Sequence, residues 1–264
     1  MKIKVIRGQN QIGGSIIEIS TQKTAIILDI GIRLDEGPEI EIPEIEGLFS
    51  GTRGYDAVLI SHYHMDHAGL LNYMVDSIPV YMGENAYKLM KVAAEYQGKE
   101  IKHTPIFYKE EEVLCIGDIK ITPYLCDHSS FDSYMFFIEG DGKKVLYTGD
   151  YRNNGRLSFE DLVNKLPEVD ALITEGTTLS RDVTEENIQE ETLEKIGIKA
   201  IENIKGPVFV MYSPMNTDRT ITLYNIAKSS NRTFLQELYV ADVSSVIGDH
   251  IPNPTNNDGI RVFL

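Results

Sequence analysis

The sequence predicts an α/β fold, and three observations support this class. Residues 1 to about 65 are rich in strand patterns, the pattern is mixed to about residue 180, and the remainder alternates helix, strand, helix and strand. Two segments, Tyr87–Tyr96 and Glu185–Ile204, repeat apolar residues at helical spacing. Several short apolar runs are followed within three residues by His or Asp. This arrangement is typical of strands that present polar side chains at the edge of a sheet.

The N-terminal region is predicted to form a β-hairpin. The glycine-rich segment Gly8–Ser15 lies between two apolar runs, as a turn between two strands does. A later apolar run, Ala57–Ile60, is typical of a short buried strand. A helical pattern begins at Ala68, so the residues between this strand and Ala68 are predicted to form a strand-to-helix turn.

That turn carries the most informative motif of the chain, Ser61-His62-Tyr63-His64-Met65-Asp66-His67. Imidazole nitrogen and carboxylate oxygen are the ligands that borderline divalent metals such as zinc select. Alternate residues of an extended segment share a face, so His62, His64 and Asp66 converge on one side while His67 turns to a neighbouring point. The motif predicts a site for two metal ions. The alternative interpretation is a group of surface histidines beside a solvated aspartate.

Two later strands end in residues suited to completing such a site. The segment Ile119–Leu125 alternates like a strand and leads to His128. The apolar run Lys144–Tyr147 leads to Asp150, and the preceding Gly149 permits a close backbone approach. Considered singly, a histidine after a strand is often a hydrogen-bonding residue and Gly-Asp is common in turns. Beside the histidine cluster, His128 and Asp150 are predicted ligands, and Asp150 is placed to bridge both ions.

The remaining elements are helices and short strands. Helices are predicted at Tyr87–Tyr96 and at Glu185–Ile204, with Thr184 as the cap of the second. Short strands are predicted at Ala171–Ile173 and Arg261–Leu264. The apolar residues expected to face the core from the two helices are Leu89, Val92, Tyr96, Ile188, Leu193, Ile196 and Ile201.

The motif H-x-H-x-D-H, followed by a downstream His and then an Asp, resembles the signature of the metallo-β-lactamase superfamily. The resemblance implies an αββα sandwich, two mixed sheets packed face to face with helices outside and metals at one edge. Asp29, at the end of the run Ile26–Leu28, is similar to the family's strand-end aspartate and is expected to orient the turn or a ligand by hydrogen bonding. In the family pattern, the first metal is held by His62, His64 and His128, the second by Asp66 and His67, and both by Asp150.

Several features resemble the β-CASP branch, which contains ribonuclease J and the metal-dependent endonucleases of RNA 3′-end processing. Thr174–Thr178 resembles the acidic motif of that branch, with Glu175 as the acidic residue. The segment Pro207–Pro214 and the helix containing Arg219 look like the start of the β-CASP cap. Gly8–Ser15 matches the opening of these enzymes.

The resemblance divides the chain into a metallo-β-lactamase domain at residues 1–180 and a partial β-CASP-like α/β domain at 181–264. In β-CASP enzymes the chain returns after the cap and supplies further histidines, and no such residues follow here. We therefore expect the chain to be cut short within the cap and the second metal to lack a ligand. Alternatively the protein is naturally short, and His250, His103 or another chain completes the site. His103 itself is expected to be an exposed loop residue.

The function implied is that of a zinc-dependent metallo-hydrolase, most simply a ribonuclease that uses a metal-bridging hydroxide. Its cofactors would be two divalent ions, zinc or alternatively manganese. Asp66 would orient the nucleophile and, with Glu175, is the expected catalytic residue. Ser129, Ser130 and Arg152 are expected to contact a substrate phosphate, although serine-rich turns and exposed arginines are common without function.

Composition indicates an ordinary globular protein. The chain has 264 residues, 42% hydrophobic and 25% charged, which suits one large or two smaller domains. No apolar stretch approaches the roughly 20 residues of a membrane span, and the N-terminus opens into a strand without a signal-peptide pattern. We expect a cytoplasmic protein without a membrane partner. Cys115 and Cys126 fit a reducing compartment; they are possible strand neighbours, and Cys126 is expected in the core.

A net charge of −15 argues against a nucleic-acid substrate, because proteins that bind phosphates usually present a basic groove. Part of the acidic excess is local, at Asp35–Glu46 and Glu185–Glu191, and bound metals would offset some of it. The first stretch either rims the active-site mouth or is a solvated loop.

Three functions therefore remain in view. The first is an RNA-cleaving phosphodiesterase, whose partner is RNA or another phosphodiester. The second is a small-molecule hydrolase of the same superfamily, cleaving a thioester, lactone or phosphoester, which suits the acidic surface better. The third is a non-catalytic binding or assembly module. Endo or exo cleavage, the physiological metal and homo-oligomer formation are left open.

Overall fold

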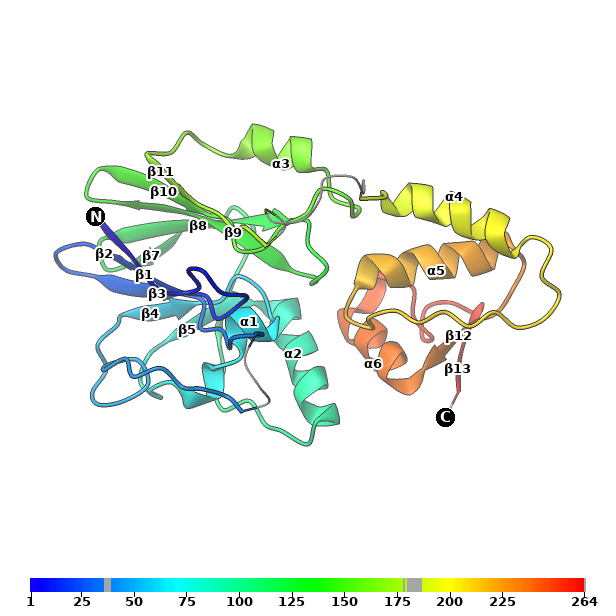
Figure 1. Cartoon of the computed structure of the whole chain (residues 1–264), viewed down its shortest axis with the longest axis horizontal. Helices are drawn as coiled ribbons and strands as arrows, with labels where there is room; N and C mark the ends of the chain where they lie inside the picture. Colours follow the sequence, from blue (N-terminus) through cyan, green and yellow to red (C-terminus); the bar gives the residue numbers. More distant parts are fainter. Residues whose placement is uncertain (36–38, 178, 180–186, 264) are drawn as a thin grey trace.

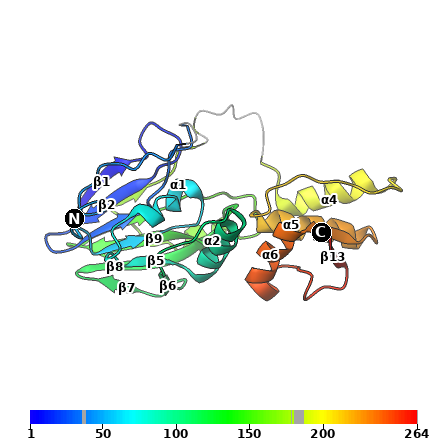
Figure 2. The same cartoon turned by 90° about the horizontal axis from the view of Figure 1, so that it is seen from below.

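The computed structural model describes residues 1–35, 39–177, 179 and 187–263, and its elements form two lobes (Figure 1). The larger lobe contains two β-sheets with helices on their outer faces. The smaller lobe holds the last three α-helices and a two-stranded sheet, and it lies beside α2 in both views (Figure 2).

The first sheet has six strands in the order β1-β2-β3-β4-β5-β6. They are β1 Lys2–Arg7, β2 Ile16–Ser20, β3 Ala25–Leu28, β4 Ala57–Leu59, β5 Val80–Gly83 and β6 Ile106–Tyr108. The first three strands pair antiparallel and the last four pair parallel. The central strands are almost continuously apolar because both faces of this sheet are covered.

The second sheet has five strands in the order β11-β10-β9-β8-β7. They are β7 Leu114–Ile116, β8 Ile119–Cys126, β9 Ser133–Gly140, β10 Lys143–Tyr147 and β11 Ala171–Ile173. All neighbours pair antiparallel except β10 and β11, which run parallel.

Three apolar layers hold the larger lobe together. The middle layer joins the two sheets, with Ile19 and Ile26 from the first and Ile121 and Phe136 from the second, all fully buried. The outer face of the first sheet packs against α1 (Met65–Ala68), the short 3-10 helix η1 (Leu71–Tyr73) and α2 (Glu84–Tyr96). The outer face of the second sheet is covered by α3 (Phe159–Lys165). The predicted αββα sandwich is confirmed.

The smaller lobe consists of α4, α5, β12, α6, the 3-10 helix η2 and β13. Their bounds are α4 Glu190–Ile201, α5 Thr217–Ser229, β12 Phe234–Glu237, α6 Leu238–Ile247, η2 Gly248–His250 and β13 Ile260–Phe263. Strands β12 and β13 pair parallel, and α4 lies along α5 (Figure 1). The side chains of Val243, Ile247 and Ile251 join the same apolar cluster as α2, so the two lobes share a core.

Several predicted elements begin at other residues in the structure. The short helix α1 begins within the histidine motif, at Met65, and ends at Ala68, where a helix was predicted to begin. The second predicted helix begins at Glu190; Ile188 and Ile196 are exposed, and Thr184 lies outside the described residues. Within the described residues α4 packs mainly along α5, and part of its apolar stripe, including Ile196, lies in solvent, which helical spacing alone did not show.

Two single-residue predictions were wrong. Tyr96 is exposed, because its hydroxyl donates to Asp242 on α6 instead of entering the core. His103 is buried rather than exposed. The two cysteines lie on neighbouring strands, Cys115 on β7 and Cys126 at the end of β8, although the cross-strand partner of Cys115 is Lys120; Cys126 is buried as expected. No helix among the described residues is both long and apolar enough to cross a membrane.

Candidate metal centre

The histidine motif follows β4 and is held in place by one buried carboxylate. Asp29 directly follows β3 and is fully buried, with a left-handed backbone (φ 57°). Its Oδ1 accepts from the backbone N–H of Ser61 at 2.7 Å, and its Oδ2 accepts from the Ser61 hydroxyl at 2.8 Å. The same Oδ2 lies 2.7 Å from Nδ1 of His67 and accepts from the hydroxyl of Tyr147 at 2.5 Å. Asp29 therefore connects both ends of the motif to the second sheet.

Gly31 allows the backbone of the motif to approach β3 closely. A Cβ atom at this position would lie 1.6 Å from the carbonyl oxygen of Asp66. The neighbouring amides of Ile30 and Ile32 donate to the carbonyls of His67 and Met65, so the two segments cannot separate without losing these bonds.

The change Gly31→Ala is expected to lower the free energy of unfolding by about 3 kcal/mol, because the methyl group must displace this backbone. Urea unfolding followed by circular dichroism would measure the loss. Gly206→Ala is a matched control, since no atom lies within 4 Å of a Cβ built there. Equal unfolding midpoints for the two variants would contradict the prediction.

Three imidazoles from two loops form the first candidate ligand group, His62, His64 and His128. One nitrogen from each ring lies within 4.8 Å of the other two, and His64 Nδ1 is 3.1 Å from His128 Nε2. The Nε2 atom of His62 is buried and has no hydrogen-bond partner among the described residues. A buried nitrogen without a partner is costly unless something accepts its lone pair. The three donors therefore fit a divalent cation of the kind that imidazoles bind.

A second group shares His62 with the first and adds His67 and Asp150. The Nε2 atom of His67 is 3.1 Å from Asp150 Oδ1 and 3.7 Å from Asp66 Oδ2. The two groups thus contain five of the six residues that the sequence suggested as ligands, and Asp66 belongs to neither. Asp66 lies at the margin of this group, while Asp150 lies beside His67 at the end of β10.

Burial sets the protonation of the first group. It lowers the pKa of His62 well below the usual histidine value, and the neighbouring imidazoles lower it further. Burial also lowers the pKa of His128, to about 3. Both rings are therefore neutral near pH 7, as metal ligands must be.

His67 behaves differently because carboxylates flank it. Burial lowers its pKa, but Asp29 and Asp150 outweigh that effect and hold the pKa well above the usual value. Burial raises the pKa of Asp150, and the hydrogen bond from His67 more than compensates and lowers it. A cation entering here would replace the proton of His67, so its binding would release protons.

A cleft of about 820 Å³ opens beside the second group. Asp66, His67, Asp150 and Glu175 line it, and Glu175 Oε1 accepts from the backbone N–H of Tyr151 at 2.9 Å. Asp35 also reaches the cleft, which agrees with an acidic stretch at its mouth, although residues 36–38 lie outside the described part. The turn at residues 8–13 also lines the cleft, and nothing in its local pattern indicated this place.

The predicted substrate residues, Ser129, Ser130 and Arg152, are not among the described residues that line this cleft. Ser129 is half-buried, whereas Ser130 is buried and its Oγ has no partner among the described residues. The guanidinium of Arg152 is paired with the carboxylates of Asp127 and Asp218, and its side chain is only 16% exposed.

Neither of the remaining candidate histidines joins the site. His250 is exposed, with its ring 5.8 Å from that of Phe131. The Nε2 atom of His103 lies 3.9 Å from Oδ1 of Asp76. Within the described residues, neither belongs to a group able to hold a metal.

Comparison with known families agrees with this geometry. The model of the metallo-β-lactamase superfamily matches residues 11–196, which include both ligand groups. The chain belongs to the metallo-β-lactamase superfamily. A crystal structure of a protein of unknown function from Enterococcus faecalis has the same fold, with a TM-score of 0.81 and 22% identity over 99% of this chain and 73% of that one.

Curated relatives of this superfamily member support the β-CASP branch. An RNase J-like protein of Methanocaldococcus jannaschii is 28% identical over 79% of this chain and 51% of its own length. The transcription termination factor FttA of Methanosarcina mazei is 31% identical over 67% of this chain and 31% of its own. The ribonuclease J of Helicobacter pylori is 25% identical over 58% of this chain and 23% of its own. The chain spans about half or less of the length of these relatives.

Proposed function

We propose that this chain carries the catalytic centre of a two-metal phosphodiesterase that cleaves RNA. One observation carries the proposal: the buried imidazole of His62 and the half-buried imidazoles of His64 and His128, whose pKa values are lowered by desolvation, adjoin a carboxylate-lined cleft through His67 and Asp150. The relatives named as ribonucleases support RNA as the substrate. In this proposal residues 1–180 form the metallo-β-lactamase domain and residues 181–264 part of a β-CASP-like domain.

The donor set favours zinc, with manganese as the alternative. The first group offers three nitrogen donors, and the second offers nitrogen from His67 and oxygen from Asp150 and Asp66. Imidazole and carboxylate together suit zinc and its neighbours better than magnesium or calcium. When bound, the cations would supply Lewis-acid chemistry and a water of lowered pKa.

The chain's own residues would position the reactants. Asp66, which lines the cleft, would orient the attacking water and accept its proton. Glu175 would fix the loop after Asp150 through its bond to the N–H of Tyr151. Ser129 and Ser130, next to His128, would offer hydroxyl groups to a phosphate oxygen. Asp29 would keep His67 oriented, as carboxylates behind metal-binding histidines do.

The first experiment is elemental analysis of chain purified without chelators, before and after brief exposure to zinc or manganese. We expect close to two ions per chain, and cleavage of single-stranded RNA that EDTA abolishes and added metal restores. No bound metal in the folded chain would refute the proposal. His103→Ala is a control that should keep the metal content, because His103 lies outside both groups.

A small-molecule hydrolase is the second candidate, favoured by one observation. The cleft is lined by the carboxylates of Asp35, Asp66, Asp150 and Glu175, which would repel a polyanion wherever no cation offsets them. Rates on RNA and on thioester, lactone and phosphoester substrates should be compared in the same metal-loaded preparation. Turnover of a small ester without RNA cleavage would favour this candidate.

A further inference from the structure

The smaller lobe contacts each of the three loops that carry candidate ligands. From the histidine motif, the hydroxyl of Tyr63 donates to the carbonyl of Met215 at 3.2 Å. From the loop after β8, Phe131 lies against His250. From the loop after β10, Arg152 pairs with Asp218 of α5. The ligand loops and the second lobe therefore form one connected structure.

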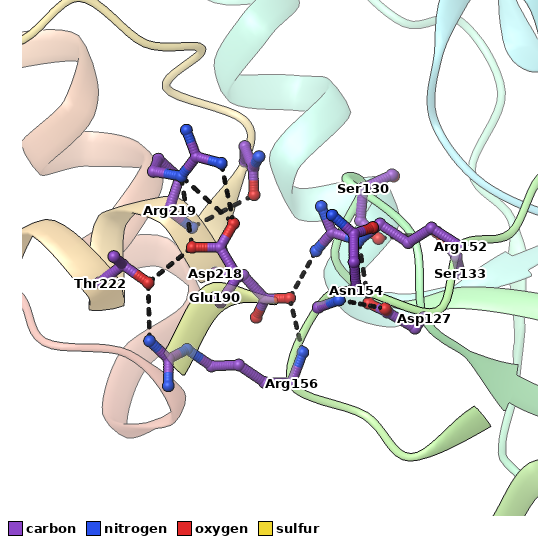
Figure 3. A network of polar contacts seen from close by, with 12 residues as sticks. Asp127, Ser130, Ser133, Arg152, Asn154, Arg156, Glu190, Asp218, Arg219 and Thr222 are labelled. Atoms are coloured by element: carbon purple, nitrogen blue, oxygen red, sulfur yellow. Dashed lines mark hydrogen bonds and ion pairs between the residues drawn. The ribbon is translucent and has the colours of Figure 1, made fainter. Parts of the chain in front are cut away.

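The contact through Arg152 is the one that reaches two ligand loops at once. Its Nε donates to Oδ1 of Asp127 at 3.1 Å, and its Nη2 donates to Oδ2 of Asp218 at 2.5 Å (Figure 3). Asp127 directly precedes His128, and Arg152 lies two residues after Asp150. One guanidinium thus joins the loop of His128, the loop of Asp150 and the start of α5.

Backbone N–H groups of the loop after β10 donate hydrogen bonds to the carboxylates of Asp127 and Asp218. The side chain of Asp127 is only 2% exposed, and its Oδ2 accepts from the N–H of Gly155 at 2.6 Å. A Cβ at Gly155 would lie 2.0 Å from Asp127 Oδ1, so the loop must carry glycine there to close around the carboxylate. Asp218 also accepts from the backbone N–H of Arg156 at 3.2 Å. The loop after β10 therefore binds both carboxylates through its backbone as well as through Arg152.

A second set of polar contacts, centred on the buried carboxylate of Glu190, anchors the same loop to α4 and α5. Arg156 Nη2 donates to Thr222 Oγ1 at 2.7 Å, and Thr222 donates to the buried carboxylate of Glu190 at 2.6 Å. Glu190 in turn accepts from Arg219 at 3.0 Å (Figure 3). Buried charges of this kind are stable only with their partners in place, which makes the geometry of the loop depend on the smaller lobe.

We propose that the ion-pair chain Asp127–Arg152–Asp218 is a positioning device through which the smaller lobe sets the relative placement of His128 and Asp150. Arg152 is then a positioning residue rather than a contact for substrate. The effect on metal binding rests on the proposed function, whereas the effect on loop order does not.

The test compares Asp218→Asn with wild type and with Asp242→Asn in the full chain. Asparagine keeps the shape of the side chain and removes the charge that pairs with Arg152. Asp242 is a matched control, because it also joins the lobes, through Tyr96 at 2.5 Å, but between α2 and α6 and away from the ligand loops. Asp218→Glu keeps the charge, displaced by one methylene, and should recover part of any effect.

Two measurements are made on each variant. Cobalt(II) is titrated against a competing chelator while its visible absorption is recorded, because the spectrum reports ligand geometry. Asp218→Asn should bind cobalt roughly tenfold more weakly, as loss of residues that support ligands typically does, with a changed spectrum. Amide hydrogen exchange at Arg152 and Gly155, whose N–H groups donate to Asp127, should also become faster.

If Asp218→Asn has the same cobalt affinity, the same spectrum and the same amide exchange as the wild type, the proposal is overturned. Equal changes in Asp242→Asn would overturn it too, because they would reflect lobe docking in general. If the wild type takes up no cobalt, the proposed function fails, and the exchange data alone decide on the ion-pair chain. Faster exchange confined to Asp218→Asn would then support it, and unchanged exchange would refute it.

Discussion

Asp66→Ala is expected to reduce the turnover of single-stranded RNA by roughly 10²- to 10⁴-fold, the range typical of a positioned acid–base group. The reason is its place beside both His67 and the cleft, with Oδ2 3.7 Å from His67 Nε2. Initial rates on a fluorescent single-stranded RNA, with the variant fully loaded with metal, would measure the effect.

A matched control for this experiment is Asp76→Ala. The Asp76 side chain is 93% exposed and lies outside both ligand groups, so its loss should leave turnover unchanged. Unchanged function in Asp66→Ala would instead favour a non-catalytic binding role for the chain.

Asp29→Ala is expected to destabilise the fold by about 3–5 kcal/mol, the cost of leaving a buried partner uncompensated. The lost carboxylate holds Ser61, His67 and Tyr147 in place, and the φ of 57° also disfavours alanine. For a chain of this size the melting temperature should fall by roughly 10 °C. Differential scanning calorimetry would record it.

The variant Asp29→Asn removes the negative charge of the side chain while nearly keeping its shape. Asparagine tolerates the left-handed backbone and keeps one acceptor oxygen, so the loss should be smaller, about 1–2 kcal/mol. A melting temperature for Asp29→Ala equal to that of wild type would show that the hydrogen bonds of Asp29 contribute little to stability.

The proximity of the candidate ligands could be predicted from the sequence because the signals for them are local. His62, His64, Asp66 and His67 occur in one short motif, and His128 and Asp150 each follow a strand with a clear apolar pattern. Strand ends in a layered fold gather at one edge, so local patterns were enough to place these side chains together.

The partners of Arg152 and Tyr147 and the burial of His103 could not be predicted, because they depend on contacts between residues far apart in the sequence. Nothing near Arg152 indicates that its partner is Asp218, 66 residues later, or that Tyr147 bonds to Asp29, 118 residues earlier. Tyr147 had one local signal, a polar atom at the buried end of an apolar strand, because a buried hydroxyl requires a partner. The burial of His103 likewise depends on the packing of its loop, which residue type does not reveal.

The two ligand groups draw on both sheets, since His62, His64 and His67 follow β4 of the first sheet while His128 and Asp150 follow β8 and β10 of the second. A cation bound there would act as a cross-link between the halves of the sandwich and would have no comparable site on the unfolded chain. At a free concentration 100-fold above its Kd, such a ligand adds about 2.7 kcal/mol to stability. Metal supply would then affect the stability of the folded protein as well as the chemistry of its cleft.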